Sequence, residues 1–440
     1  MSRYWAEHVQ LPGGLASRVS FEVRDGRFGA VEAGVDRESG DEPFDGVVLP
    51  GFANAHSHAF HRALRGRTQA DRGSFWIWRQ QMYAVADRLN PDSYLELARA
   101  VFAEMTLAGM TVVGEFHYLH HDRSGRRYAD PNAMGAALIQ AAQEAGIRIT
   151  LLDACYLSGG LDGNGHRPLD PVQQRFSDSS VTAWAERVAA MPESPTSRIG
   201  SALHSVRAVP EAALAEVADL AAPRPMHVHL SEQPAENHAV QAFYGCTPTQ
   251  LLARHGLLGP ETTAVHATHM TGSDITLLGD ARTAVCFCPT TERDLADGIG
   301  PARALADGGS PICLGSDQHT VIDMFEEIRG LESHERLQSH ERGRLTSDEL
   351  VNAASVAGYN SLGWEGGRIA EGAPADFIVV ATDSVRTVGS RPDQVIHSAT
   401  AADVRRVVVA GETVVSDGEH RLGPIAPMLA KALARLDDQP

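Results

Sequence analysis

Short apolar runs and amphipathic stretches alternate along most of this 440-residue chain. The apolar runs that are candidate strands cover residues 47–55, 111–117, 149–156, 199–206, 226–230, 264–269, 284–289 and 312–317. The amphipathic stretches between them include residues 91–108, 132–146, 210–222 and 247–255. Continuous apolar runs are typical of strands that are buried on both faces of a parallel sheet. Because the alternation offers eight strands, it favours an α/β fold of the (β/α)8 TIM-barrel type over an open doubly wound sheet.

Both ends of the chain carry β-rich segments outside this alternation. Near the N-terminus, residues 18–23 have a strand-like pattern and an Asp25-Gly26 turn follows them. Residues 375–380 and 404–415 are β-rich again. The simplest topology is a barrel whose two flanks meet in one small domain. We expect a small β-sandwich domain over residues 1–50 and 365–425, a barrel over 51–364 and a C-terminal tail helix over 426–440.

Charge and cysteine content restrict the partners and the compartment. The net charge of −18 argues against a nucleic acid or an anionic membrane as a partner. The five cysteines are scattered and form no Cys-x-x-Cys pair, which favours reduced thiols and argues against a thiolate zinc site. The N-terminal residues lack a basic-then-apolar signal, and no apolar run is long enough to span a bilayer. We therefore expect a cytoplasmic protein without a membrane partner.

The scarcity of lysine excludes several kinds of catalytic chemistry. Lys431, close to the C-terminus, is the only lysine in the chain. A core lysine that forms a Schiff base, clamps a phosphate or carries a carbamate between two metal ions is therefore excluded.

Histidines and carboxylates gather where the predicted strands end. They are His56 and His58 in the first run, His204 with Arg207 in the fourth, His227, His229 and Glu232 in the fifth, His266 and His269 in the sixth, and Asp317 in the eighth. Catalytic groups of a (β/α)8 barrel lie at these ends, and a His-x-His pair on a strand puts both imidazoles on one face. Three imidazoles and one carboxylate would suit Zn²⁺ with an open position for water. Spacing alone leaves open the choices between His227 and His229 and between His266 and His269.

These residues resemble the motifs of the amidohydrolase superfamily, in particular its mononuclear zinc deaminases. The matching motifs are His56-x-His58 after a Pro-Gly turn, His229-x-x-Glu232, His266, Ser316-Asp317 and the return into the small β-domain at 367–379. A narrower set resembles the formimidoylglutamate deiminases: residues 55–62, 73–79 with Met82-Tyr83, 114–118, 204–207 and 289–292. That family hydrolyses N-formimidoyl-L-glutamate to N-formyl-L-glutamate and ammonia in histidine degradation.

The resemblance implies a role for each of these site residues. It implies one zinc ion per chain, with His56, His58, His229 and Asp317 as the ligands. It implies attack of a metal-bound hydroxide on the formimidoyl carbon, with Glu232, His266 and Asp317 as the catalytic groups. The substrate carboxylates would lie against Arg79 and Arg207, helped by His61, Tyr118 and His204. His61 stands where this family more often carries glutamine, and the family also implies a homodimer.

Two other readings of the chain remain as alternatives. One is a purine or pyrimidine deaminase, or a triazine-type aminohydrolase, on the same metal scaffold. Arginines in the pocket argue against it, because they favour an acyclic substrate with two negative charges. The other is a non-catalytic interaction protein that has kept the barrel. Loss of function should delete ligands or the acid, whereas His56, His58 and Glu232 are all present.

Overall fold

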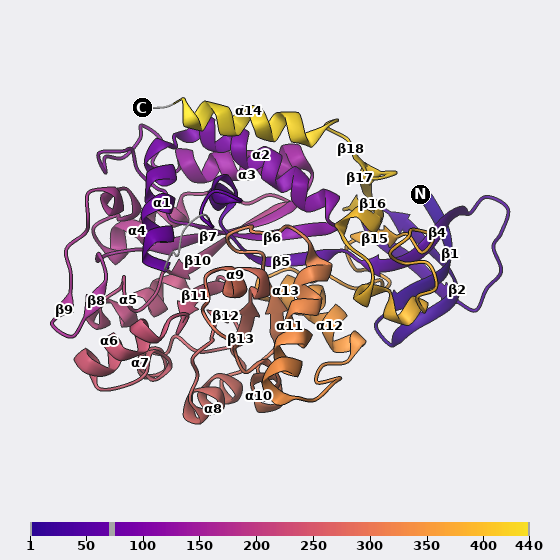
Figure 1. Cartoon of the computed structure of the whole chain (residues 1–440). Coiled ribbons are helices and arrows are strands. Elements are labelled where there is room, and N and C mark those ends of the chain that lie inside the picture. The colour runs from indigo at the N-terminus through magenta and orange to yellow at the C-terminus, as the bar shows by residue number, and fades with distance from the viewer. Residues whose placement is uncertain (1, 70–74, 439–440) are drawn as a thin grey trace.

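Eight parallel strands form the central sheet in the computed structural model, which describes residues 2–69 and 75–438 (Figure 1). They are β5 (Phe52–Ser57), β6 (Met110–His117), β7 (Arg148–Cys155), β10 (Ser197–Leu203), β11 (Met226–Leu230), β12 (Thr262–His266), β13 (Ala284–Phe287) and β14 (Ile312–Leu314). Each strand pairs with the next one along the sheet in chain order. Every one of them overlaps a run predicted as a strand, which confirms the α/β class and the predicted barrel.

The two edges of this sheet meet beside the His-x-His motif. Ser57 at the end of β5 forms a parallel bridge with Asp317, just beyond β14. The amide of Asp317 donates to the carbonyl of His56 at 3.0 Å, and the amide of His58 donates to the carbonyl of Asp317 at 3.1 Å. Closure of the barrel therefore brings residues 56–58 and Asp317 side by side, although they are far apart in the sequence.

Helices surround the barrel on its outside (Figure 1). α2 begins where Asn90 and Ser93 form a capping box and Pro91 occupies the first turn, which satisfies free amides there. The helices are α1 (Phe75–Arg88), α2 (Pro91–Leu107), α3 (Ala133–Ala145), α4 (Val181–Ala189), α5 (Glu211–Ala221), α6 (Pro234–Tyr244), α7 (Pro248–Arg254), α8 (Gly272–Asp280), α9 (Pro289–Asp294), α10 (Ala302–Gly308), α11 (Met324–Ser339), α12 (Ser347–Ala354), α13 (Val356–Ser361) and α14 (Ile425–Asp437). The hairpin β8 (Leu161–Asp162) and β9 (Gly165–His166) projects from the barrel beside α6.

The two flanks of the chain meet in a second sheet, at the right of Figure 1. Its strands are β1 (Ser2–Leu11), β2 (Gly14–Arg24), β3 (Arg27–Ala33), β4 (Glu42–Pro50), β15 (Phe377–Val380), β16 (Val404–Val409), β17 (Glu412–Ser416) and β18 (Glu419–His420). β15 pairs antiparallel with β4, so the C-terminal strands extend the N-terminal ones in one hydrogen-bonded sheet. The exact domain limits given above remain a prediction.

An aromatic cluster fills the core of this smaller sheet. Tyr4, Phe21, Phe28, Phe44 and Phe377 are all buried. Their neighbouring rings lie with centroids 4.9 Å apart for Tyr4 and Phe44 and 5.4 Å apart for Phe21 and Phe377. Because the cluster draws on β1, β2, β4 and β15, its packing holds the two flanks together.

The first predicted strand, residues 47–55, is wrong as a single element. It divides at Gly51 into β4 of the flank sheet and β5 of the barrel. The amide of Gly51 donates to the carbonyl of Asp376 at 3.0 Å, and a Cβ on Gly51 would come within 2.2 Å of Thr111 Oγ1. Because both strands are buried, the residues on the two sides of Gly51 form one apolar run, and the sequence does not show where one strand ends and the next begins.

A buried ion pair joins the flank sheet to the barrel at the N-terminal end of β7. Arg148 Nε lies 2.8 Å from Asp376 Oδ2, and both side chains are buried. The Tyr359 hydroxyl donates to the same carboxylate at 2.9 Å and the Ala410 amide at 2.6 Å. Breaking a buried pair of this kind typically costs about 3–5 kcal/mol, so this contact fixes how the sheet meets the barrel.

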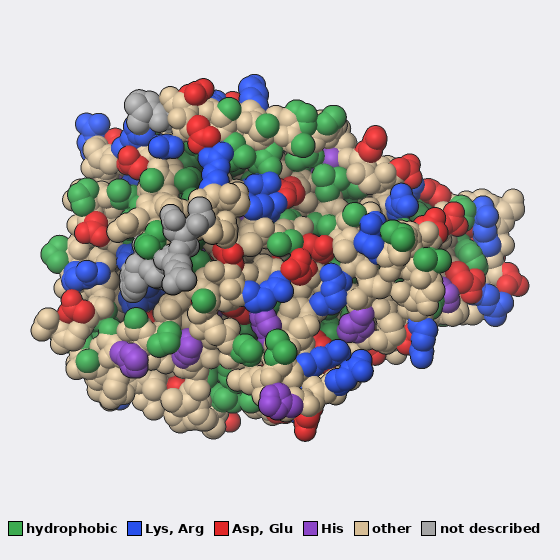
Figure 2. All heavy atoms as spheres, in the orientation of Figure 1, with side chains coloured by type: hydrophobic (Ala, Val, Ile, Leu, Met, Phe, Trp, Pro, Cys, Tyr) green, Lys and Arg blue, Asp and Glu red, His purple; other side chains and the backbone are tan. Residues whose placement is uncertain are grey.

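The surface carries both signs of charge. On the face drawn in Figure 2, blue basic and red acidic side chains are interspersed, so that face lacks a continuous basic stripe of the kind that nucleic-acid binders use. Among the helices of the described residues, none has the length and apolar character needed to cross a membrane.

Candidate active site

One pocket opens at the carboxyl ends of the barrel strands, where this fold carries its active sites. It is lined by every residue of the predicted site except His56, which lies buried beside it: His58, His61, Arg79, Tyr118, His204, Arg207, His229, Glu232, His266 and Asp317. The structure thus brings together side chains from strands spread over most of the chain.

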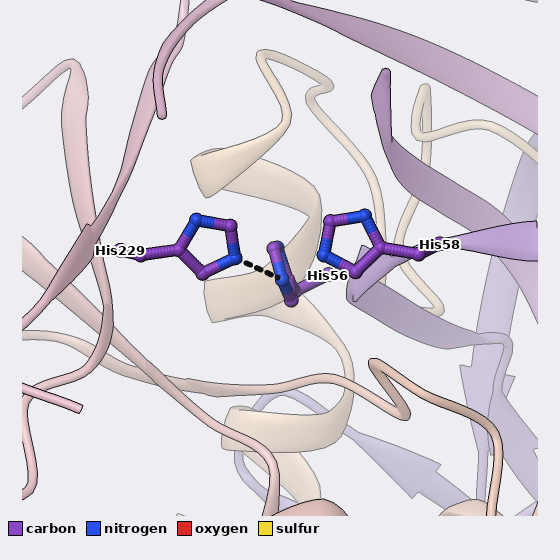
Figure 3. A group of neighbouring side chains, drawn as sticks. All are labelled: His56, His58 and His229. Carbon is purple, nitrogen blue, oxygen red and sulfur yellow. Dashed lines mark hydrogen bonds between the residues drawn. The ribbon is translucent and has the colours of Figure 1, made fainter. Parts of the chain in front are cut away.

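Three imidazoles and one carboxylate converge at the floor of this pocket. Nε2 of His56 lies 3.2 Å from Nε2 of His229. Asp317 Oδ1 lies 3.5 Å from His56 Nε2 and 3.4 Å from His58 Nε2. Figure 3 shows the rings of His58 and His229 on either side of His56. Donor atoms of these three histidines lie within 4.8 Å of one another, which is close enough to share a metal ion.

Backbone carbonyls fix the protonation of two of these rings. His58 Nδ1 lies 3.0 Å from the carbonyl oxygen of Phe116, and His229 Nδ1 lies 2.9 Å from that of His204. A carbonyl only accepts, so each ring donates from Nδ1 and turns its Nε2 lone pair towards the site. Metal-binding histidines usually have this outer partner.

The electrostatics of these rings fit a cation. Burial foremost, then the neighbouring histidines, holds the pKa values of His56 and His229 well below the usual range, and burial lowers the pKa of His58 to about 4. The rings are therefore neutral at pH 7, and Nε2 of His56 and Nε2 of His229 lie 3.2 Å apart. Neutral imidazole nitrogens gathered beside a carboxylate are donors that a divalent metal ion takes, so the residues present fit a metal site.

The backbone at this rim is strained. Ser231, His266 and Asp317 have positive φ angles of 49°, 72° and 43°. Such left-handed conformations cost about 1–3 kcal/mol each for residues with side chains, and they persist where the surrounding structure enforces them. The three lie just after or at the end of β11, β12 and β14, so the turns that aim the site residues are held by the barrel.

His266 is surrounded by carboxylates. Its Nε2 lies 3.8 Å from Glu232 Oε1 and 3.9 Å from Asp317 Oδ2, and its Nδ1 lies 3.4 Å from Glu292 Oε1. Burial lowers the pKa of His266, but Glu232, Glu292 and Asp317 outweigh it and raise that pKa to about 10. Burial raises the pKa of Glu232, which His266 and Arg207 partly oppose. His266 and Glu232 can therefore hold a proton between them in the pocket.

The remaining predicted residues line the pocket around this floor. His61, in the 3₁₀ helix Ala59–Leu64, lies with Nε2 3.1 Å from the hydroxyl of Tyr118. Arg79 on α1 donates from Nε to the hydroxyl of Tyr83 at 2.7 Å. His204 follows β10 and lines the same pocket. Gly73 and Ser74, which begin the 73–79 motif, lie outside the described residues.

The structure also separates the histidines that spacing left open. His227 Nε2 lies 3.0 Å from the carbonyl oxygen of Ser361, and His227 does not line the pocket. His269 Nε2 lies 2.8 Å from the carbonyl oxygen of Asp297. His229 and His266 are the members of the two pairs that face the floor.

Several residues at the site were not predicted. Glu292, which orients His266, follows β13, so the strand-end rule applied to the seventh strand would have found it. Tyr156 follows β7 in the same way and lines the pocket. Arg167 reaches the pocket from just after β9, and Glu236 lies beneath Arg207 on α6. Nothing in the sequence marks these last two, because neither lies at the end of a barrel strand.

The fold and the site define a class. The Amidohydrolase family model matches residues 47–414, and the chain belongs to that family. It is 36% identical, over 96% of each chain, to the formimidoylglutamate deiminase of Pseudomonas aeruginosa, which confirms the narrower resemblance. Family and relative identify it as a hydrolase acting on carbon–nitrogen bonds.

Solved structures agree with this assignment. An amidohydrolase from Brucella melitensis superposes with a TM-score of 0.89 at 30% identity, covering 99% of this chain and 100% of that one. An adenosine deaminase from Xanthomonas campestris with bound zinc superposes with a TM-score of 0.84 at 23% identity, covering 99% and 97%. The second likeness supports the fold alone.

A pair of variants tests the metal site. His229→Asn should lose the bound metal ion, because it removes an Nε2 donor that lies 3.2 Å from His56 Nε2. His227→Asn should keep it, since that ring contacts Ser361 instead. Metal content of the purified, folded variants decides between them. Loss of metal from His227→Asn alone would reverse the assignment.

Proposed function

We propose that this chain hydrolyses N-formimidoyl-L-glutamate to N-formyl-L-glutamate and ammonia. The observation that carries the proposal is the arrangement of a single pocket: a cluster suited to a metal ion and the acid Glu232 lie at its floor, and the arginines Arg79 and Arg207 line it. An acyclic substrate with a formimidoyl group and two carboxylates matches that arrangement of charge. The identity to the Pseudomonas aeruginosa formimidoylglutamate deiminase supports the same substrate.

We assign one zinc ion per chain to His56, His58, His229 and Asp317. Zinc takes three such protein nitrogens and a carboxylate oxygen readily and, when bound, lowers the pKa of a water molecule towards ~7. The missing core lysine argues against a second, carbamate-bridged ion.

Asp317 and His266 are assigned to the attacking water. Asp317 takes a proton from the water as its oxygen attacks the formimidoyl carbon, which makes that carbon tetrahedral. His266 donates from Nε2 to the developing centre, and Glu292 at its Nδ1 keeps the ring in the orientation that this requires. The positive charge that the carboxylates sustain on His266 stabilises the negative charge formed in this step.

Glu232 is assigned to the departing nitrogen. The formimidoyl group is largely cationic, so a carboxylate both binds it and can deliver a proton to it. Protonation of the terminal nitrogen breaks the bond that releases ammonia, whereas protonation of the glutamate nitrogen would cleave the wrong bond. The position of Glu232, within 4 Å of His266, allows the proton to pass at the floor of the pocket.

The substrate's glutamate moiety is assigned to the arginines. Arg207 and Arg79 present guanidinium groups suited to carboxylates, and His61, Tyr118 and His204 add polar groups to the same pocket. A neutral purine, pyrimidine or triazine offers no carboxylate to these guanidinium groups, so the arginines disfavour that alternative. Homodimer formation and a cytoplasmic location remain predictions.

A direct assay tests the proposed function. The zinc-loaded protein should release ammonia from N-formimidoyl-L-glutamate, and it should do so far faster than from guanine, cytosine or adenosine at equal concentration. Coupled detection of ammonia measures all four. Preference for a nucleobase or nucleoside would replace the proposed substrate, and inactivity on all four would remove it.

Glu232→Gln isolates the proton transfer. The variant should retain zinc, because Glu232 is not assigned as a ligand, and should lose about 10²–10⁴-fold in kcat, the usual contribution of a general acid–base group. Metal analysis and steady-state kinetics on the same preparation measure both. Near-normal turnover, or loss of the metal, would contradict this role.

Arg207→Met isolates carboxylate recognition. Removing a charged partner from a desolvated carboxylate costs on the order of 2–5 kcal/mol, so kcat/KM for formimidoylglutamate should fall by tens- to thousands-fold. Formamidine has no carboxylate, and its kcat/KM should change far less. An equal loss on both substrates would mean that Arg207 supports the fold or the metal site instead.

A further inference from the structure

Arg207 lies between two glutamates of one short segment. Its Nη2 is 3.6 Å from Glu232 Oε2, and its Nε is 3.5 Å from Glu236 Oε2. Arg207 and Glu232 both line the pocket, whereas Glu236 does not. Glu236 contacts the arginine from the protein side, in the first turn of α6.

The burial of Glu236 is costly and calls for an explanation. Its side chain is 0% exposed, and neither carboxylate oxygen receives a well-formed hydrogen bond within the described residues. Burial raises the pKa of Glu236 to about 7; Arg207 opposes this rise most, and the backbone amides of Ser231 and Glu232 oppose it less. A buried carboxyl group usually requires close partners. Among the described residues, the cation in contact with it is the arginine assigned to the substrate.

The atom that Glu236 faces decides what it can do. Nε is the guanidinium nitrogen attached to the side-chain stem, and its 3.5 Å contact with Glu236 is an ion pair rather than a well-formed hydrogen bond. A negative charge at this nitrogen draws the root of the planar group towards α6 and so restrains its direction. Arg207 has several rotatable bonds and is half-buried, and its terminal nitrogens are the ones available to a carboxylate. An arginine held in advance loses less conformational entropy when the ligand binds.

We propose that Glu236 is the positioning residue for substrate carboxylate recognition, holding Arg207 through its Nε so that the terminal nitrogens face the pocket. Glu236 acts through Arg207 and does not touch the substrate. The inference rests on the proposed function, because it takes the ligand of Arg207 to be a carboxylate.

Two variants of the zinc-loaded protein separate positioning from a general structural role. Glu236→Met removes the acceptor at similar volume and should raise KM for formimidoylglutamate at least tenfold, with kcat changed less than threefold. Glu236→Gln keeps an oxygen that can accept from Nε and should restore most of the affinity. Neither should alter kcat/KM for formamidine or the zinc content.

Glu335→Met serves as a matched control. Glu335 on α11 is also buried and lies 3.7 Å from an arginine Nε, that of Arg344, but it is remote from the pocket. The same substitution there should lower stability without changing KM for either substrate. A KM change in this control of the size seen for Glu236→Met would attribute the effect to lost stability and overturn the proposal.

Binding of glutarate keeps the test independent of turnover. Calorimetry should show that the wild-type protein binds this dicarboxylate and that Glu236→Met binds it at least tenfold more weakly. Suppose that the wild type binds glutarate at least tenfold more tightly than Glu236→Met but does not turn over formimidoylglutamate. The proposed function then fails, whereas this inference stands. Equal glutarate binding by wild type and Glu236→Met, or no binding by the wild type, would overturn the inference. A parallel loss on formamidine, or loss of zinc, would also overturn it.

Discussion

Closure of the barrel between β5 and β14 is the constraint on which the site depends. The backbone bonds that join His56, His58 and Asp317 are the same bonds that close the sheet, so the fold cannot close without setting these side chains next to one another. The left-handed conformations of Ser231, His266 and Asp317 are maintained by the same framework. The close packing of the buried barrel interior offsets the free-energy cost of these strained conformations. The site is therefore a property of the closed sheet as much as of its individual residues.

Neighbouring charged groups give the two equally buried halves of the pocket floor opposite character. Around His56, His58 and His229, burial favours neutral imidazoles, and carbonyl partners on His58 and His229 direct lone pairs inward. Around His266, buried carboxylates outweigh burial and favour the imidazolium. Imidazole side chains are thus suited to bind a metal ion on one side and to carry a proton on the other. Local environment assigns these roles, as it does for paired titratable groups in other enzymes.

Prediction from sequence succeeded where the physical signal was local. Continuous apolar runs located all eight barrel strands, and the strand-end rule located the pair His227 and His229 and also Asp317, because barrel chemistry lies at those ends. It failed at Gly51, where two buried strands of different sheets read as one apolar run. Glu292 was missed although it follows β13. Glu236 was missed because its partner Arg207 is contributed by another strand segment, and no spacing in the sequence records that contact.

The sequence by itself determined the strand–helix order, the candidate donors and the absence of a core lysine, because periodicity and composition do not depend on distant contacts. The motifs also determined the family to which the chain belongs. Spacing left open the choices between His227 and His229 and between His266 and His269, and the family resemblance favoured His229 and His266. The tertiary structure separates the members of each pair, because the direction of each side chain depends on the turn that carries it. It alone showed Arg207 held between Glu232 and Glu236. Such arrangements arise from packing between segments distant in the chain, and local propensity carries no information about them.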